Sequence, residues 1–181
     1  KYALVVMLGD KDVTTNCTFT YNGSTEKPTN AGTYTVVATY SDMSRDGYPG
    51  HTGTATATLT ISQRPLTAKV TYPAITYGDA VDVTDANVCK VEFGNLVTGE
   101  SLTMGTDFTV RTNYKAGDNV EGDYGFFITL QETAVAKNYD VKTVTGLLTV
   151  NPKSLTAAMV EDVTAGLTYN GNEQTPTVTV K

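Results

Sequence analysis

The sequence is poor in the residues that most often build metal and redox sites. It holds one histidine and two cysteines among 181 residues, and it has no tryptophan. Neither Cys17 nor Cys89 has a second cysteine at CxxC spacing, and one histidine cannot complete a zinc site with them. We expect two buried free thiols, because a disulfide would have to join two different domains of the organisation described below. The sequence therefore predicts no metal and no cofactor.

Positive charge and long apolar runs are also scarce. Lysine and arginine total 13 against 19 acidic residues, which gives a formal net charge of −6. Neutralising phosphates needs clustered basic residues, so a nucleic-acid partner is excluded, and an acidic surface also avoids anionic membranes. No run approaches the ~18 apolar residues of a spanning helix. We expect no membrane insertion by this chain, and we expect any export signal or anchor to lie outside it.

Threonine is the residue in excess, with 34 copies. Its β-branched, hydroxylated side chain favours strands with one wet face and disfavours helices. The 16 glycines and 6 prolines interrupt the chain at short intervals, which leaves no stretch suited to a helical bundle. The composition therefore favours an all-β fold.

Alternating polarity places the strands. Residues 54–61 alternate threonine with apolar residues, so that one face carries Ala55, Ala57, Leu59 and Ile61. Residues 33–40 alternate in the same way, with Tyr34, Val36, Ala38 and Tyr40 on one face. The segments 124–130 and 141–150 are expected to be the corresponding strands of a second copy. Short strands separated by turn signals such as Asn22-Gly23 and Gly78-Asp79 are typical of a β-sandwich.

Internal repetition is the strongest organisational signal. Landmarks recur in the same order at an offset of 89 residues, or 90 in the last pair: Phe19-Thr20 as Phe108-Thr109, Leu59-Thr60-Ile61 as Leu148-Thr149-Val150, Leu66-Thr67-Ala68 as Leu155-Thr156-Ala157, and Gly32-Thr33-Tyr34 as Gly122-Asp123-Tyr124. A repeat at fixed spacing indicates a tandem array of modules. We expect a first module at residues 1–63 that lacks its opening strands, a complete module at 64–152, and the opening strands of a further module at 153–181.

Proline marks the joints between these modules. Arg64-Pro65 and Asn151-Pro152 each follow the last expected strand of a module. Proline cannot donate to a strand ladder and it restricts the residue before it, so these linkers should be short and stiff. The modules are then expected to stand in line as a rod.

Several motifs resemble one known family. In the second copy they lie at residues 75–80, which include Tyr77-Gly78-Asp79, and at 94–102, 116–124, 138–139 and 147–152. The first copy carries sister motifs at 19–24, 28–34 and 59–62, and residues 167–176 look like the opening of another copy. Together they resemble the MBG-type immunoglobulin-like repeats of large bacterial surface proteins. The resemblance implies tandem immunoglobulin-like β-sandwich modules in an exported adhesin or stalk protein at the bacterial cell surface.

No catalytic constellation is visible. His51, the single histidine, lies in the Gly50-His51-Thr52-Gly53 stretch, where a solvent-facing turn is expected. No serine or cysteine nucleophile can be paired with it from the sequence, and no glycine-rich loop leads into a helix. The sequence therefore predicts a protein that is not an enzyme.

Two modifications of a surface stalk are weaker hypotheses. Calcium could bind Asp79, Asp82 and Asp85, or Asp118, Glu121 and Asp123, but neither set has EF-hand spacing and solvated loop charge is the favoured interpretation. An isopeptide bond could use Lys69, Lys115 or Lys142, but each is more simply an exposed or edge residue of a strand.

The leading functional hypothesis is a stalk or spacer that projects an adhesive region located elsewhere. The alternative is an adhesive module that itself binds host glycans or proteins. Because tryptophan is absent, a sugar platform would rest on tyrosine, and the candidate ligand-facing loop is Tyr40, Tyr48 and His51. Most tyrosines, however, fall at inward-facing strand positions or turn corners.

The two ends of the chain are out of phase with the repeat. By the 89-residue offset Lys1 corresponds to Lys90, whereas the tail carries the opening of a further module. We expect residues 167–181 to complete the sandwich begun by residues 1–61 of an adjacent copy. This pairing could join separate chains, or it could be a step in a longer tandem array.

Overall fold

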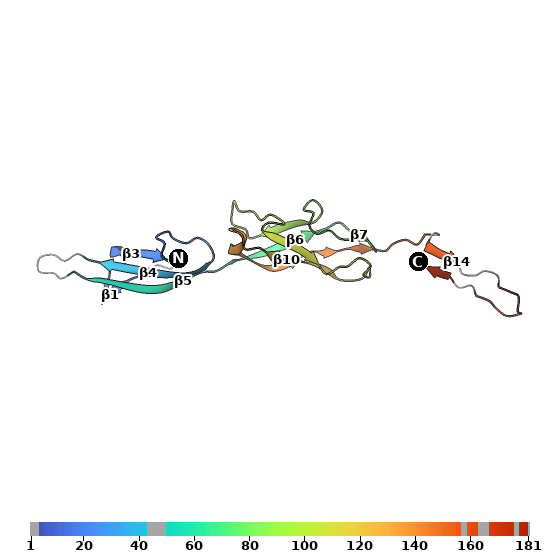
Figure 1. Cartoon of the computed structure of the whole chain (residues 1–181), viewed down its shortest axis with the longest axis horizontal. Helices are drawn as coiled ribbons and strands as arrows, with labels where there is room; N and C mark the ends of the chain where they lie inside the picture. Colours follow the sequence, from blue (N-terminus) through green and yellow to red (C-terminus); the bar gives the residue numbers. More distant parts are fainter. Residues whose placement is uncertain (1–3, 43–49, 157–158, 163–166, 176–177, 181) are drawn as a thin grey trace.

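The structure, a computed structural model, describes residues 4–42, 50–156, 159–162, 167–175 and 178–180. In these ranges the regular elements are β-strands and two single-turn 3-10 helices, so the expected all-β class is confirmed. The strands form six small sheets, and none of these sheets mixes strands from residues 4–61, 64–151 and 160–180. Figure 1 shows the three stretches following one another along the long axis of the molecule.

The first stretch, residues 4–61, is called the first unit. A small pair of strands, β1 (Met7–Leu8) and β2 (Lys11–Asp12), and the 3-10 helix η1 (Thr14–Asn16) precede a three-stranded antiparallel sheet. That sheet has the order β3-β4-β5 and consists of β3 (Cys17–Tyr21), β4 (Gly32–Ser41) and β5 (Thr52–Ile61). The strands expected at 33–40 and 54–61 are therefore confirmed. Val36 and Ala38 are buried as expected, but Ala55 and Ala57 are exposed, so this sheet's apolar face is only partly covered.

The second stretch, residues 64–151, is called the second unit and holds three sheets. One has the order β11-β6-β8, another β12-β10-β9, and the third pairs β13 with β7. The strands are β6 (Arg64–Thr71), β7 (Ile75–Thr76), β8 (Lys90–Gly94), β9 (Phe108–Thr112), β10 (Tyr124–Leu130), β11 (Tyr139–Thr145), β12 (Leu147–Leu148) and β13 (Val150–Asn151), with the 3-10 helix η2 (Ala136–Asn138) before β11. β6 runs parallel to β11 and antiparallel to β8.

The hydrophobic core of the second unit is shared between its two three-stranded sheets. Its buried members come from both sheets and from adjoining loops: Val70, Cys89, Phe108, Val110, Tyr114, Tyr124, Phe126, Leu148 and Val150. Phe93 of β8 meets Phe108 of β9 edge to face, with ring centroids 4.9 Å apart. Edge-to-face aromatic pairs add to the stabilisation from burial alone, so this contact ties one sheet to the other.

The expected strand at 141–150 is corrected by the structure, which divides this segment. β11 pairs with β6, and after Gly146 the chain continues as β12, which pairs with β10 of the other sheet. Gly146 has φ +119°, a conformation that residues with a side chain rarely adopt. The glycine therefore lets the chain switch sheets.

The first proline joint also differs from expectation. Arg64 and Pro65 are not linker residues but the first two residues of β6, paired with Tyr139 and Asp140 of β11. Proline is tolerated near the start of a strand, where its missing N–H costs few ladder bonds. The link between β5 and β6 is therefore only Ser62 and Gln63, which is shorter than the sequence suggested.

The tail, residues 153–180, contains one described strand pair. β14 (Val160–Asp162) runs antiparallel to β15 (Val178–Val180). The expected completion of residues 1–61 by residues 167–181 stays a prediction, because it involves an adjacent copy.

The two cysteines differ in burial. Both are free thiols, and Cys89 is fully buried in the core as expected. Burial raises the pKa of the Cys89 thiol, and the charge of Asp82 adds to the rise. Cys17 is only half-buried at the start of β3, so the expectation of two buried thiols is wrong for this residue, which lies where the first unit's sheet is incompletely covered.

Candidate functional site

The joint between the first and second units is the best-defined contact between different parts of the chain. Asn138, at the end of η2, accepts a hydrogen bond at Oδ1 from the backbone N–H of Ala31, at 2.8 Å. Its Nδ2 donates to Oδ1 of Asn30 at 3.1 Å and to the carbonyl of Ala134 at 3.2 Å. One side chain of the second unit therefore binds two residues at the entrance to β4 while it is held by its own helix.

The linker is bound to the second unit as well. Gln63 Nε2 donates to the carbonyl of Lys137 at 3.0 Å, and Arg64 Nε donates to the carbonyl of Asn95 at 2.6 Å. With both residues engaged and only two residues between β5 and β6, little of the linker is left to bend.

A buried tyrosine supports this end of the second unit. Tyr139 is 2% exposed, and its hydroxyl donates to the Glu100 carboxylate and accepts from the N–H of Val97 at 2.9 Å. Burial and the hydrogen bond to Glu100 raise the pKa of Tyr139, so the phenol stays protonated as a donor. The loop that contains the Asn95 carbonyl is thus anchored beneath the linker.

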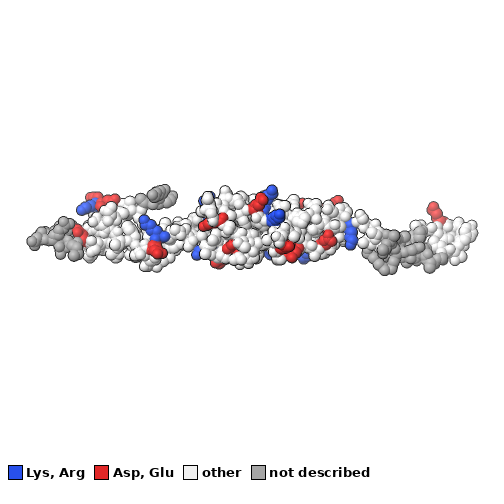
Figure 2. All heavy atoms as spheres, turned by 90° about the horizontal axis from the view of Figure 1, so that it is seen from above, with Lys and Arg blue, Asp and Glu red and all other residues white. Residues whose placement is uncertain are grey.

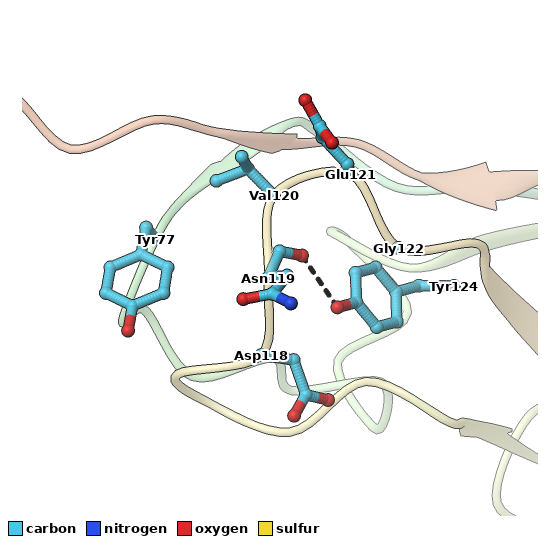
Figure 3. Close-up of a pocket in the computed structure, with 7 residues that line it drawn as sticks. All are labelled: Tyr77, Asp118, Asn119, Val120, Glu121, Gly122 and Tyr124. Carbon is cyan, nitrogen blue, oxygen red and sulfur yellow. Dashed lines mark hydrogen bonds between the residues drawn. The ribbon is translucent and has the colours of Figure 1, made fainter.

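Both units carry the same tyrosine hydrogen bond to a nearby upstream carbonyl. The Tyr34 hydroxyl donates to the carbonyl of Asn30 at 2.9 Å, and that of Tyr124 donates to the carbonyl of Asn119 at 2.6 Å. Figure 3 shows the second bond across the mouth of its loop. A Cβ on Gly122 would lie 2.7 Å from Cε2 of Tyr124, so this glycine leaves room for the ring. This arrangement is the tyrosine corner found in immunoglobulin-like sandwiches.

The Tyr124 corner borders an open hollow of about 610 Å³. Its lining residues, drawn in Figure 3, are Tyr77, Asp118, Asn119, Val120, Glu121, Gly122 and Tyr124. Asp118 and Glu121 make it acidic, and burial together with the charge of Asp118 raises the pKa of Tyr124. The Asp118 carboxylate accepts from the N–H of Lys115 at 2.8 Å, so it closes its own turn rather than facing a ligand.

The proposed calcium residues are likewise engaged in local turns. Asp79 accepts from the N–H of Thr76 at 2.9 Å, and Asp85 accepts from that of Asn87 at 2.8 Å. Asp82 accepts from the side chain and N–H of Thr84 at 2.6 and 2.8 Å, which lowers the pKa of its carboxyl. Among the described residues no group of three or more metal-ligating side chains converges. The interpretation as solvated loop charge is thus the one the geometry favours.

The three lysines considered for an isopeptide bond are all exposed. Lys69 lies on β6, Lys115 in the turn closed by Asp118, and Lys142 on β11, where it forms an ion pair with Asp140. The apolar setting that the bond needs is absent at each of these positions.

The structure brings two of the three candidate ligand-facing residues together. Tyr40, near the end of β4, and His51, directly before β5, line one hollow of about 220 Å³ with Val6, Met7, Val13 and others. His51 is exposed, as expected, and the carbonyl of His51 accepts from the N–H of Asp42 at 2.8 Å. Tyr48 lies outside the described residues. Thr52 and Gly53, expected in a turn, belong to β5 because they pair with Ser41 and Tyr40.

Charge does not gather into one patch. On the face seen in Figure 2, acidic and basic side chains are interspersed along the molecule. Such a surface offers no electrostatic stripe for a polyanion.

The first unit has a relative among known families. Residues 10–65 match the MBG domain family. The MBG match confirms the resemblance inferred from the sequence, and it indicates a repeat of the kind found in bacterial surface proteins. It spans β2 to the beginning of β6, so it covers the first copy, whereas the second copy is linked to it by the internal repeat. Neither a curated protein nor a solved structure matches the chain.

The part of the chain that the structure describes contains no helix with the length and apolar character needed to cross a membrane. MBG domains occur in surface proteins, which fits a repeat of this type.

Sequence reasoning missed the residues of the joint. Lys137-Asn138 was recognisable only as a turn signal, and Asn30 and Gln63 carried no signal of their own. The repeated Gly-x-Tyr of Gly32-Thr33-Tyr34 and Gly122-Asp123-Tyr124, by contrast, could have revealed the tyrosine corners.

Proposed function

We propose that the chain is a spacer segment of an extracellular bacterial surface protein, whose adhesive region lies elsewhere. It is built from tandem immunoglobulin-like β-sandwich modules, with boundaries at residues 1–63, 64–152 and 153–181. The module at 1–63 and the complete one at 64–152 are held at a fixed angle to each other. The observation that carries this proposal is the joint, where Asn138 binds Asn30 and Ala31 across a two-residue linker.

The physical argument is about bending. Each hydrogen bond contributes about 0.5–1.5 kcal/mol, so the two bonds of Asn138 and the one of Gln63 hold the angle against thermal motion. A spacer needs this stiffness to keep its far end away from the cell surface, whereas an enzyme or a binding module does not. The immunoglobulin-like assignment is supported by the two tyrosine corners and by the core shared between two facing sheets.

The proposal includes no catalytic step and no cofactor. The carboxylates considered for chemistry cap their own turns, and His51 is exposed beside β5 rather than paired in a cleft. A role in position and reach is therefore the one that the observed contacts support.

Asn138→Ala tests the joint. The variant loses both bonds to the first unit, so we expect the two units to tumble with separate rotational correlation times, while the wild type tumbles as one elongated body. The midpoint of thermal unfolding should change little, because about 1–2 kcal/mol of contact is lost at one end of the unit. Backbone ¹⁵N relaxation measures the tumbling of each unit.

Asn119→Ala is the matched control, since Asn119 is exposed and contributes its backbone carbonyl, not its side chain, to the tyrosine corner. Independent tumbling of the units in the wild type, or unchanged joint tumbling in Asn138→Ala, contradicts the proposal.

A second candidate function is adhesion by this segment itself. It is favoured by the hollow that Tyr40 and His51 line with apolar residues at the end of the first unit's sheet. Specific micromolar binding of mucin glycans by the chain, lost in Tyr40→Ala, would favour this candidate over the spacer.

A further inference from the structure

The first unit presents an apolar sheet face that its own residues cover incompletely. Strand register places Phe19, Ala38 and Ala55 side by side, and Tyr21, Val36 and Ala57 in the next row. Because side chains two apart share a face, Tyr34 and Leu59 extend the same surface. We call this surface the open face; its residues are Phe19, Tyr21, Tyr34, Val36, Ala38, Ala55, Ala57 and Leu59.

Part of the open face is covered and part is not. Residues 4–13 lie against it, and Val13 is 2% exposed. Beside this segment a hollow of about 420 Å³ remains between Leu4, Phe19, Tyr21 and Leu59. Ala55 and Ala57 are exposed, and Phe19 and Leu59 are half-buried.

The matching positions of the second unit are covered. Phe108 and Leu148, which correspond to Phe19 and Leu59 by the 89-residue repeat, are each 3% exposed. Their cover includes β6, whose Leu66, Ala68 and Val70 are all buried and whose Val70 belongs to the same core. The first unit contains no strand in the position of β6, since its described sheets are β1-β2 and β3-β4-β5.

The tail repeats the sequence of β6 but leaves it exposed. Leu155-Thr156-Ala157 reproduces Leu66-Thr67-Ala68 at the 89-residue offset. Leu66 is fully buried, whereas Leu155 is 67% exposed. Leu167 and Tyr169, which continue the tail, are 54% and 91% exposed. Exposed apolar side chains in such a row indicate a surface made for contact.

We propose that the open face binds the tail of a second copy of this chain, with Leu155 taking the place that Leu66 occupies in the second unit. The tail cannot supply its own first unit. Leu155 lies four residues beyond β13, a reach of at most about 14 Å, and Figure 1 shows the whole second unit between the tail and β3-β4-β5.

The pairing is head-to-tail, so it does not close on itself. Each copy offers one open face and one tail at opposite ends, and a heterologous contact of this kind builds open chains rather than a closed dimer. The inference goes beyond the spacer function and holds equally for an adhesive module.

The test is the concentration dependence of the mass of the full chain, measured by analytical ultracentrifugation. We expect a ladder of oligomers for the wild type. Leu155→Asp should raise the apparent Kd at least about tenfold, because it buries an unpaired charge in the contact. Thr156→Asp should leave the Kd unchanged, since the corresponding Thr67 of β6 is exposed.

The open face has its own matched pair. Ala57→Asp should weaken association as strongly as Leu155→Asp, whereas Thr56→Asp, on the opposite face of β5, should not. All four positions are exposed in the single chain, so folding is retained and circular dichroism checks it. A chain that stays monomeric at every concentration, or association that survives both Leu155→Asp and Ala57→Asp, overturns the proposal.

Discussion

Replacing Gly146 with alanine is expected to destabilise the second unit by at least about 3 kcal/mol. Gly146 has φ +119°, so an added Cβ is strained whatever space surrounds it. The space is also occupied, because that Cβ would overlap the carbonyl oxygen of Val70 and lie 3.0 Å from its carbonyl carbon. Backbone atoms of β6 cannot move aside as a flexible side chain does. Chemical denaturation followed by circular dichroism measures the loss.

Gly125→Ala provides the control for this substitution. Gly125 lies in β10, its φ is not positive, and nothing lies within 4 Å of the position of an added Cβ. We expect a change within about 0.5 kcal/mol. Equal stability of the Gly146 and Gly125 variants would mean that the switch between sheets does not need a glycine.

Phe126→Ala is expected to cost about 3–5 kcal/mol, the range for removing a large aromatic side chain from a packed core. Phe126 is 4% exposed, and its ring centroid lies 6.2 Å from that of Tyr72. Truncation removes buried area and leaves a cavity between the two sheets of the second unit. The free energy of unfolding from urea titration measures the effect.

The neighbouring residue supplies the comparison. Phe127 is 49% exposed on the opposite face of the same strand, so Phe127→Ala should cost less than about 1 kcal/mol. A similar loss in both variants would contradict the assignment of Phe126 to a core shared by two sheets.

Strand positions could be predicted where one face of the strand is chemically distinct from the other. The alternation of threonine with apolar residues at 54–61 was enough to find β5, and the Tyr34–Tyr40 alternation found β4. The division of 141–150 was not predictable from alternation, because it depends on a partner in another sheet. At the position of Gly146 the first unit has Ala57, and there β5 continues unbroken along β4.

Burial was harder to predict than strand position. Alternation assigns a face, but whether that face is covered depends on a strand distant in sequence. Ala55 and Ala57 have the expected direction and are exposed, since the first unit lacks the counterpart of β6.

The contacts between units were beyond the reach of sequence patterns. An asparagine in a turn is explained by turn chemistry, and nothing in Lys137-Asn138 indicates that its amide binds residues more than 100 positions away. For the candidate ligand-facing loop, proximity in sequence was sufficient, because Tyr40 and His51 flank the connection between the paired strands β4 and β5.

Small-angle scattering of the full chain, extrapolated to zero concentration, tests the stiff tandem arrangement most directly. A compact domain of 181 residues has a radius of gyration of about 16 Å. We predict a value well above this, with a cross-sectional profile typical of a rod and with the shape unchanged over a range of ionic strength. A radius of gyration near the compact value, with a globular distance distribution, would contradict the account.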